Sequence, residues 1–191
     1  MGKRRKSQVE PEPVSLVLPP SLYLGPYSAA SDKSFLISNP VTHVLSIGPN
    51  PSRKVDGITY RRLALNDSAS SSIFKVVDAA CVIIDRVIAS KMNTGKILVH
   101  CAAGVSRSPM VVAAYLMKRR GMSLRAALGQ IIRVRPQILP NVGFLQQLKE
   151  MEMELFGTIS PDVEELPEQE KDRLALSEVT VPNATETSSD V

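Results

Sequence analysis

One short stretch of the chain combines a nucleophile, a pliable loop and a phosphate-binding side chain. Residues 100–108 read HCAAGVSRS and directly follow the apolar run 97–99. Small residues that include a glycine let the chain curl until successive backbone N–H groups point at one place, and such a nest binds an anion. The residues expected to form this phosphate cradle are Ala102, Ala103, Gly104, Val105 and Ser106.

The residues at the two ends of the cradle predict its chemistry. A helix beginning at Arg107 would add N–H donors and positive potential, and a guanidinium grips two phosphate oxygens at once. The same field favours the thiolate of Cys101, which is the nucleophilic form of cysteine. A cysteine and an arginine with five residues between them are also compatible with a buried thiol beside an unrelated surface charge. Here, however, the pair lies between a predicted strand and a predicted helix, as a cysteinyl-phosphate mechanism requires.

Three segments together resemble a known family. HCAAGVSRS is followed by AYLMKRRGMSLRAAL and then by RPQILPNVGFLQQL. In this order they resemble the dual-specificity protein phosphatases, and most closely the small atypical members of this branch of the cysteine-dependent protein tyrosine phosphatases. The resemblance covers about residues 14–157 and is strongest from Lys96 onward. It implies hydrolysis of phosphotyrosine and of phosphoserine or phosphothreonine.

The resemblance also implies roles for three further residues. Ser108 would donate a hydrogen bond to the cysteine sulfur and help it leave, although a serine there is also an ordinary residue of a helix start. His100 would order the cradle backbone and help lower the thiol pKa, or would be a structural core histidine. Asp67 lies between a predicted strand and a predicted helix, 34 residues before Cys101. It would supply the general acid that the leaving oxygen needs, unless it is only a turn residue.

Hydrophobic periodicity and turn residues predict the elements that position this site. The residues 14–25 read as two short strands split by a Pro-Pro pair, 29–37 as a short helix, and 41–47, 58–65 and 96–100 as strands. Helices are expected over 73–90 and 107–120, then from a cap at Ser123 to before Pro136, and from a cap at Asn141 to Gly157. This order predicts a single α/β domain with a mixed or mostly parallel central sheet flanked by helices.

The chain divides into an arm, a domain and a tail. A length of 191 residues fits one domain with extensions. We expect a flexible basic arm over 1–13, the catalytic domain over 14–157 and an acidic disordered tail over 158–191. Residues 160–191 hold nine acidic and two basic residues, a net charge of −7, against 21 basic and ten acidic residues elsewhere, a net charge of +11. A basic body suits anionic phosphosubstrates, and it also serves solubility.

The small number of cysteines and the lack of long apolar runs indicate the cellular compartment of the protein. The chain has two cysteines, Cys81 and Cys101, and no secretory signal or membrane span is evident. We therefore expect a cytoplasmic or nuclear protein. Cys81 reads as a buried apolar helix residue, with a rescue disulfide to Cys101 as the alternative. No metal is expected, because no histidine or cysteine cluster has metal-ligand spacing, and no cofactor is implied.

The expected partners are phosphorylated proteins, signalling kinases among them, and not nucleic acid. Residues 189–191 would suit a weak PDZ-type contact. Two other functions stay open: a phosphatase for a non-protein phosphate such as a phosphoinositide or a glucan, and a catalytically weak phosphoprotein-binding relative. The cradle carries none of the lysines found in phosphoinositide-type relatives, which favours a protein substrate.

Overall fold

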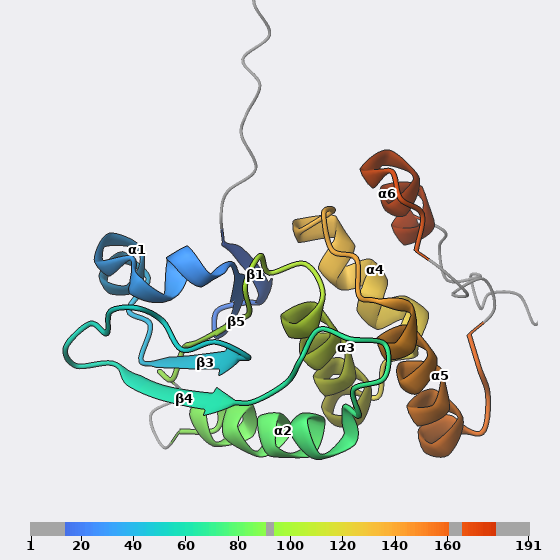
Figure 1. Ribbon diagram of the computed structural model, residues 1–191, viewed down its shortest axis with the longest axis horizontal. Helices are drawn as coiled ribbons and strands as arrows, with labels where there is room; N and C mark the ends of the chain where they lie inside the picture. The colour runs from blue at the N-terminus through green and yellow to red at the C-terminus, as the bar shows by residue number, and fades with distance from the viewer. Residues whose placement is uncertain (1–13, 91–93, 161–165, 179–191) are drawn as a thin grey trace, which may run out of the picture.

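A five-stranded mixed sheet forms the centre of the molecule, with helices on both faces (Figure 1). The computed structural model describes residues 14–90, 94–160 and 166–178. In sheet order the strands are β1 (Ser15–Leu18), β2 (Leu22–Gly25), β5 (Ile97–His100), β3 (His43–Ile47) and β4 (Thr59–Leu63). Strand β1 is antiparallel to β2, whereas β2, β5, β3 and β4 run parallel to one another. The mixed, mostly parallel sheet expected from the sequence is confirmed.

Alternating strand residues separate the interior into two cores. Ile97 and Val99 of β5 face the larger core, whereas Leu98 between them faces the smaller one. The smaller core lies under the 3-10 helix η1 (Tyr27–Ser31) and helix α1 (Lys33–Ser38). The larger core is filled by α2 (Phe74–Ile88), α3 (Arg107–Arg120), α4 (Leu124–Val134) and α5 (Val142–Phe156).

Helix α3 is the central helix, and its sequence explains its place. Residues 108–117, rich in Ala, Val and Met, are all buried, because the helix lies against the sheet and also contacts α2, α4 and α5. Gly121, with φ of +65°, ends it. The two predicted caps are present: Ser123 Oγ accepts from the N–H of Ala126, and Asn141 Oδ1 accepts from the N–H of Phe144. These short connections bring α4 and α5 back beside α3.

Two sequence-based expectations need correction. The single helix expected over 29–37 is two short helices, since Asp32 ends η1 and accepts from the N–H of Phe35 to begin α1. The tail expected to be disordered from 158 onward is structured in part: α6 (Glu170–Glu178) packs against α4 (Figure 1), and Leu166 is buried in the larger core. Acidic composition predicted disorder, but the segment contains buried residues, Leu166 and Arg173, that pack it against the body.

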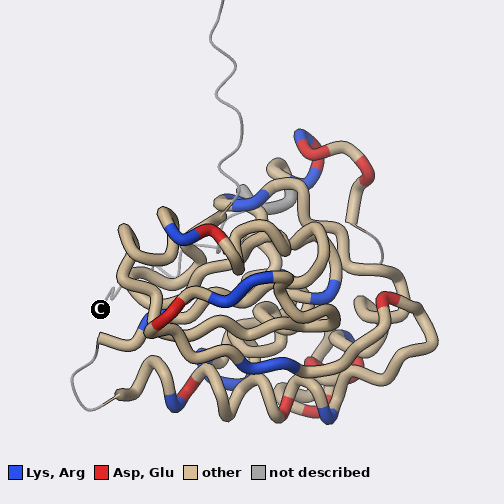
Figure 2. Tube along the Cα trace, turned by 60° about the vertical axis from the view of Figure 1, so that its left-hand side comes forward, with Lys and Arg blue, Asp and Glu red and all other residues tan. Residues whose placement is uncertain are grey.

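Some expectations concern parts of the chain outside the described residues. These are the basic arm 1–13 and residues 179–191, with the C-terminal residues considered for a PDZ-type contact. In the part that the structure describes, no helix has the length and apolar character needed to cross a bilayer. Figure 2 shows that Lys and Arg are interleaved with Asp and Glu over the described body.

Candidate active site

Cys101 follows β5, the middle strand of the sheet, at the edge where the parallel strands end. Ligands of open parallel sheets bind at this edge. Cys101 is 1% exposed, and its Sγ accepts a hydrogen bond of 3.2 Å from Ser108 Oγ, which is buried in the first turn of α3. The structure thus brings together Cys101 and Ser108 as the sequence predicted, with one hydroxyl aimed at the sulfur.

The loop between Cys101 and Arg107 is held from outside through its carbonyl groups. In a trans peptide unit the C=O and the N–H point in opposite directions. Carbonyls held from outside therefore aim the N–H groups of residues 102–106 toward the interior of the loop, which is the geometry of an anion nest. The five contacts are Cys101 O with His100 Nδ1 (3.0 Å), Ala102 O with the Tyr27 N–H (2.8 Å), Ala103 O with Arg135 Nη2 (3.1 Å), Gly104 O with Arg135 Nε (2.8 Å), and Val105 O with the Leu139 N–H (2.8 Å).

Gly104 allows the loop to close. Its φ is +68°, a conformation that other residues rarely adopt. A Cβ at this position would lie 2.6 Å from Gly25 O and 2.8 Å from Arg135 Nη2. The glycine is therefore required both by the backbone turn and by the close approach of β2 and Arg135.

The surroundings of Cys101 favour its thiolate. Burial alone would raise the pKa of the thiol. Hydrogen bonds from the Ser108 hydroxyl and from the N–H groups of Ser108 and Gly104, together with the charge of Arg107, outweigh burial and lower the pKa of Cys101 below its ordinary value. The predicted field of the cradle and helix start is thus present at the sulfur.

His100 has a structural part in the cradle. Its Nδ1 lies 3.0 Å from a carbonyl, Cys101 O, so Nδ1 carries the proton, and Nε2 accepts from Ser46 Oγ at 2.7 Å. Burial lowers the pKa of His100, despite the opposing effect of its bond to Cys101 O, and thereby favours the neutral ring. The side chain orders the peptide after Cys101, while the contacts that lower the thiol pKa come from other residues.

Asp67 lies beside the cradle and contacts its C-terminal end, at Ser106 and Arg107. Its Oδ1 accepts from Ser106 Oγ (2.7 Å) and from Asn141 Nδ2 (2.9 Å), and its Oδ2 is 3.3 Å from Arg107 Nε. Arg107 Nε is buried and faces this carboxylate without hydrogen-bond alignment. The Asp67 side chain is 36% exposed, so it lies at the surface of the site. A carboxyl group at this place can exchange protons with both the solvent and a group bound in the cradle.

The loop that carries Asp67 is anchored on α5. Gln147 Nε2 donates to Ser71 O (2.9 Å), and Gln147 Oε1 accepts from the N–H of Ile73 (3.0 Å). Ala69 packs closely on Gly143 of α5, and a Cβ at position 143 would lie 2.1 Å from Ala69 O. Helix α5 therefore fixes the loop that presents the candidate general acid.

Gly48, at the end of β3, supports the other side of Arg107. Its φ is +109°, and any Cβ there would collide with Arg107 Nη1. Its carbonyl accepts from Arg62 Nε of β4, and its N–H donates to Leu63 O at 2.9 Å. The guanidinium of Arg107 is thus packed between Gly48 and Asp67.

Sequence reasoning missed several contributions to the site. Asn141 was predicted only as a helix cap, and it also binds Asp67. Arg135 and Gly48 act through contacts with residues far away in the sequence, and Ser106 acts through its side chain as well as its backbone. A signal was present for Gly48: it directly follows a buried strand, where a parallel sheet places its ligand-binding loops.

Cys81, the other cysteine of the chain, lies away from the site. Cys81 of α2 is buried in the larger core, where burial raises its pKa to about 11, and both cysteines are free. Its prediction as a buried apolar residue is confirmed. Within residues 14–90, 94–160 and 166–178, no group of three His, Cys, Asp or Glu side chains is placed to hold a metal ion.

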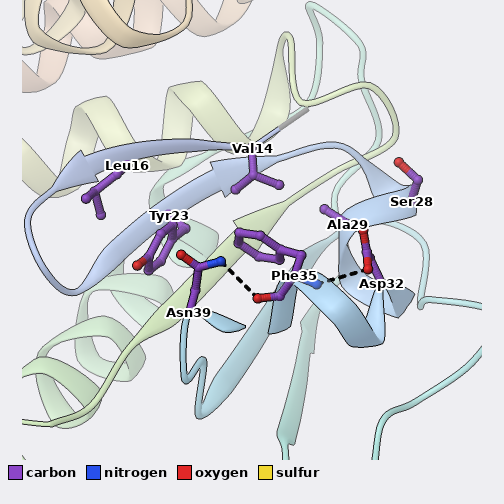
Figure 3. Close-up of a pocket in the computed structure, with 8 residues that line it drawn as sticks. All are labelled: Val14, Leu16, Tyr23, Ser28, Ala29, Asp32, Phe35 and Asn39. Carbon is purple, nitrogen blue, oxygen red and sulfur yellow. Dashed lines mark hydrogen bonds between the residues drawn. The ribbon is translucent and has the colours of Figure 1, made fainter. Parts of the chain in front are cut away.

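A separate hollow of about 330 Å³ lies between β1, β2 and α1, and none of the site residues above lines it. Figure 3 shows Tyr23 and Phe35 in its wall, with Asp32 and Asn39 beside them. The side chains of Asp32 and Asn39 are occupied at the ends of α1: Asp32 accepts from the N–H of Phe35, and Asn39 Nδ2 donates to Phe35 O at 3.0 Å. These two side chains therefore serve as caps of α1.

Comparison with known proteins agrees with the geometry. Residues 22–154 match the family model described as "Dual specificity phosphatase, catalytic domain". The chain is 38% identical over 133 residues to dual specificity protein phosphatase 1 of Arabidopsis thaliana and 39% identical over 131 residues to dual specificity protein phosphatase 15 of Homo sapiens. Each alignment covers 69% of this chain, but they span only 65% and 43% of those relatives.

A solved structure shows the same fold. The crystal structure of human DUSP28 is similar with a TM-score of 0.69 and 31% identity, covering 76% of this chain and 97% of that one. The chain belongs to the dual specificity phosphatase family and carries its catalytic domain.

Proposed function

We propose that the protein hydrolyses phosphate monoesters on phosphotyrosine and on phosphoserine or phosphothreonine of proteins. The observation that carries the proposal is the buried Cys101 sulfur at the base of a loop whose carbonyls are all held outward. Inward N–H groups and the Arg107 guanidinium complement the three charged oxygens of a phosphoryl group. Family membership supports the same activity.

The first step transfers the phosphoryl group to the enzyme. The Cys101 thiolate attacks phosphorus and forms a P–S bond, while the P–O bond to the substrate oxygen breaks. Asp67, carrying a proton, gives it to that oxygen, which leaves as a neutral alcohol or phenol. Arg107 and the cradle N–H groups stabilise the charge on the transferred group.

The second step frees the enzyme. Asp67, now a carboxylate, takes a proton from water as the water oxygen attacks phosphorus, and the P–S bond breaks. The Ser108 hydroxyl, which donates to Cys101 Sγ, stabilises the departing thiolate. The products are inorganic phosphate and the original thiolate, so the cycle needs no cofactor.

Protein substrates are favoured over phosphoinositides. The cradle side chains are small and uncharged between Cys101 and Arg107. A polyphosphorylated headgroup would need extra cations inside the cradle to neutralise its further phosphates. We propose phosphorylated signalling proteins, kinases included, in the cytoplasm or nucleus as the substrate class.

Phosphate release from a substrate panel tests the proposal. The panel contains phosphotyrosine, phosphothreonine and phosphoserine peptides, a phosphoinositide and a phosphorylated glucan. The wild type should act on the peptides, and Cys101→Ser should lose about a thousandfold or more of that activity. The matched control Cys81→Ser should retain it. A preference for the lipid or glucan would overturn the substrate class, and activity retained in Cys101→Ser would overturn the mechanism.

A further inference from the structure

Helix α6 lies outside the residues that match the family model, yet it is tied to the body of the domain. The chain leaves α5 through Ser160, whose N–H and hydroxyl both donate to the buried carboxylate of Glu152 (2.7 and 2.6 Å). Glu152 also accepts from the N–H of Leu124 at the start of α4. Further along, Leu166 is buried and Leu174 packs against the larger core. The segment is therefore part of the folded body.

Arg173 is the most unusual residue of α6. The residue is 3% exposed, and within the described part of the chain its guanidinium donates to three backbone carbonyls: Nε to Pro136 O (2.7 Å), and Nη1 to Glu168 O (2.8 Å) and Pro167 O. Burying a charged group is costly unless it is hydrogen-bonded. A leucine at this position would serve α6 packing without that cost, so the choice of arginine indicates a role in holding those carbonyls.

The carbonyl held by Arg173 Nε belongs to a segment that holds three consecutive carbonyls of the cradle. Pro136 directly follows Arg135, whose guanidinium holds Ala103 O and Gly104 O. Three residues after Pro136, the N–H of Leu139 holds Val105 O. Residues 135–139 thus make three of the five contacts that hold the cradle carbonyls outward, and Arg173 of α6 binds this segment at Pro136 O.

We infer that Arg173 is a positioning residue for the phosphate cradle, acting through Pro136 and Arg135. Holding Pro136 fixes where the Arg135 guanidinium and the Leu139 N–H lie. Those groups set the directions of the Gly104, Val105 and Ser106 N–H groups, because each N–H lies opposite a held carbonyl in its peptide unit. A small displacement of such groups reduces anion binding and thiol reactivity steeply. The dual-specificity site of this protein therefore includes a residue from beyond its catalytic core.

The inference rests on the proposed Cys101 chemistry. The experiments therefore measure phosphate affinity and thiol reactivity rather than turnover. In the full chain, Cys101 is alkylated with iodoacetamide over a range of pH, and inorganic phosphate is titrated as a protecting ligand. Arg173→Ala should shift the alkylation midpoint to higher pH and weaken protection by phosphate about tenfold. Arg173→Lys, which keeps a donor and the charge, should recover part of both losses.

Lys171→Ala is the matched control, since Lys171 is an exposed cation on the same helix. It should behave as wild type. Because Arg173→Ala also risks unfolding, each variant is compared below its measured unfolding transition, and a double-mutant cycle of Arg173→Gln with Arg135→Lys gives an independent reading. Losses in phosphate affinity that are less than additive support the inference.

Different results would contradict the role of Arg173 and the proposed function. Folded Arg173→Ala and Arg173→Gln with wild-type phosphate protection and alkylation profile, or strictly additive effects in the cycle, would reduce Arg173 to a stabilising residue of α6. Failure of phosphate to protect Cys101 in the wild type would instead count against the proposed function itself.

Discussion

The reactivity of Cys101 is set by donors that belong to separate parts of the chain. Ser108 donates directly to the sulfur, while Tyr27, Arg135 and Leu139 act through the carbonyls of the cradle. None of these four donors is itself a nucleophile or an acid. Their common effect is to place positive charge and N–H dipoles where a phosphoryl group and a thiolate carry negative charge.

The two cysteines should differ sharply in reactivity. The pKa of Cys101 is lowered, whereas burial raises that of Cys81 to about 11. Since the thiolate is the reactive form, iodoacetamide at neutral pH should label Cys101 alone, with a rate that rises as the pH increases through the Cys101 pKa. Peptide mapping by mass spectrometry identifies the site. Equal labelling of Cys81 in the folded protein would contradict the assignment.

Asp67 should matter in proportion to the basicity of the leaving group. Asp67→Ala removes the proton donor, so kcat on a phosphothreonine peptide should fall by about 10²–10⁴. The loss should be much smaller for an activated aryl phosphate, whose leaving oxygen needs little protonation. Asp78→Ala, at an exposed carboxylate of α2, is the control and should have no such effect. An equal loss on both substrates would make Asp67 a structural residue.

At the scale of elements, local sequence determined the helices and strands, while contacts between distant elements completed the site. The caps at Ser123 and Asn141 and the apolar spacing of α2 are local signals, and they predicted helix ends to within a few residues. Such local signals could not assign Arg135, and the place of Gly48 after a buried strand could not show its contact with Arg107. Their roles depend on β3 and α4 ending beside a loop that begins more than 30 residues away from either.

The close contact between Gly48, at the end of β3, and the Arg107 guanidinium can be tested by substitution. In Gly48→Ala the new methyl group would collide with the Arg107 guanidinium, so phosphate affinity should fall. Gly57→Ala is a matched control, because Gly57 also has a positive φ (+80°), but a Cβ there would meet no atom within 4 Å. Both variants should lose about 1 kcal/mol of stability from backbone strain.

The distinguishing measurement is inhibition by inorganic phosphate, with aryl phosphate as substrate. Only Gly48→Ala should show weakened inhibition. A similar loss of phosphate affinity in Gly57→Ala would mean that loop strain, and not contact with Arg107, controls the site.

At the scale of the whole molecule, the folded body extends beyond the part predicted from composition. The acidic residues after 160 favoured a disordered tail, and composition alone could not identify the few side chains that pack. Leu166 and Arg173 are such residues: one fills the larger core and the other holds three carbonyls. Their effect depends on where α4 ends, which is a property of the assembled fold.

Two truncations measure this extension. Ending the chain after Ser160 removes Leu166 and Arg173 and exposes the face of α4 that α6 covers, so Tm should fall by at least about 5 °C. Ending it after Glu178 keeps both residues and should leave Tm close to that of the full chain. Thermal unfolding followed by circular dichroism decides the matter. Equal Tm values for the two truncations would show that α6 contributes nothing to stability.

The covalent intermediate is the most direct test of the proposed chemistry. Wild-type protein mixed with a phosphotyrosine peptide and quenched in acid within milliseconds should carry one phosphoryl group, which mass spectrometry should locate on Cys101. Cys101→Ser should form no cysteinyl-phosphate, and Cys81→Ser should form it normally. Phosphate release that proceeds without a phosphoryl group on Cys101 at any time, or that continues undiminished in Cys101→Ser, would contradict catalysis through this residue.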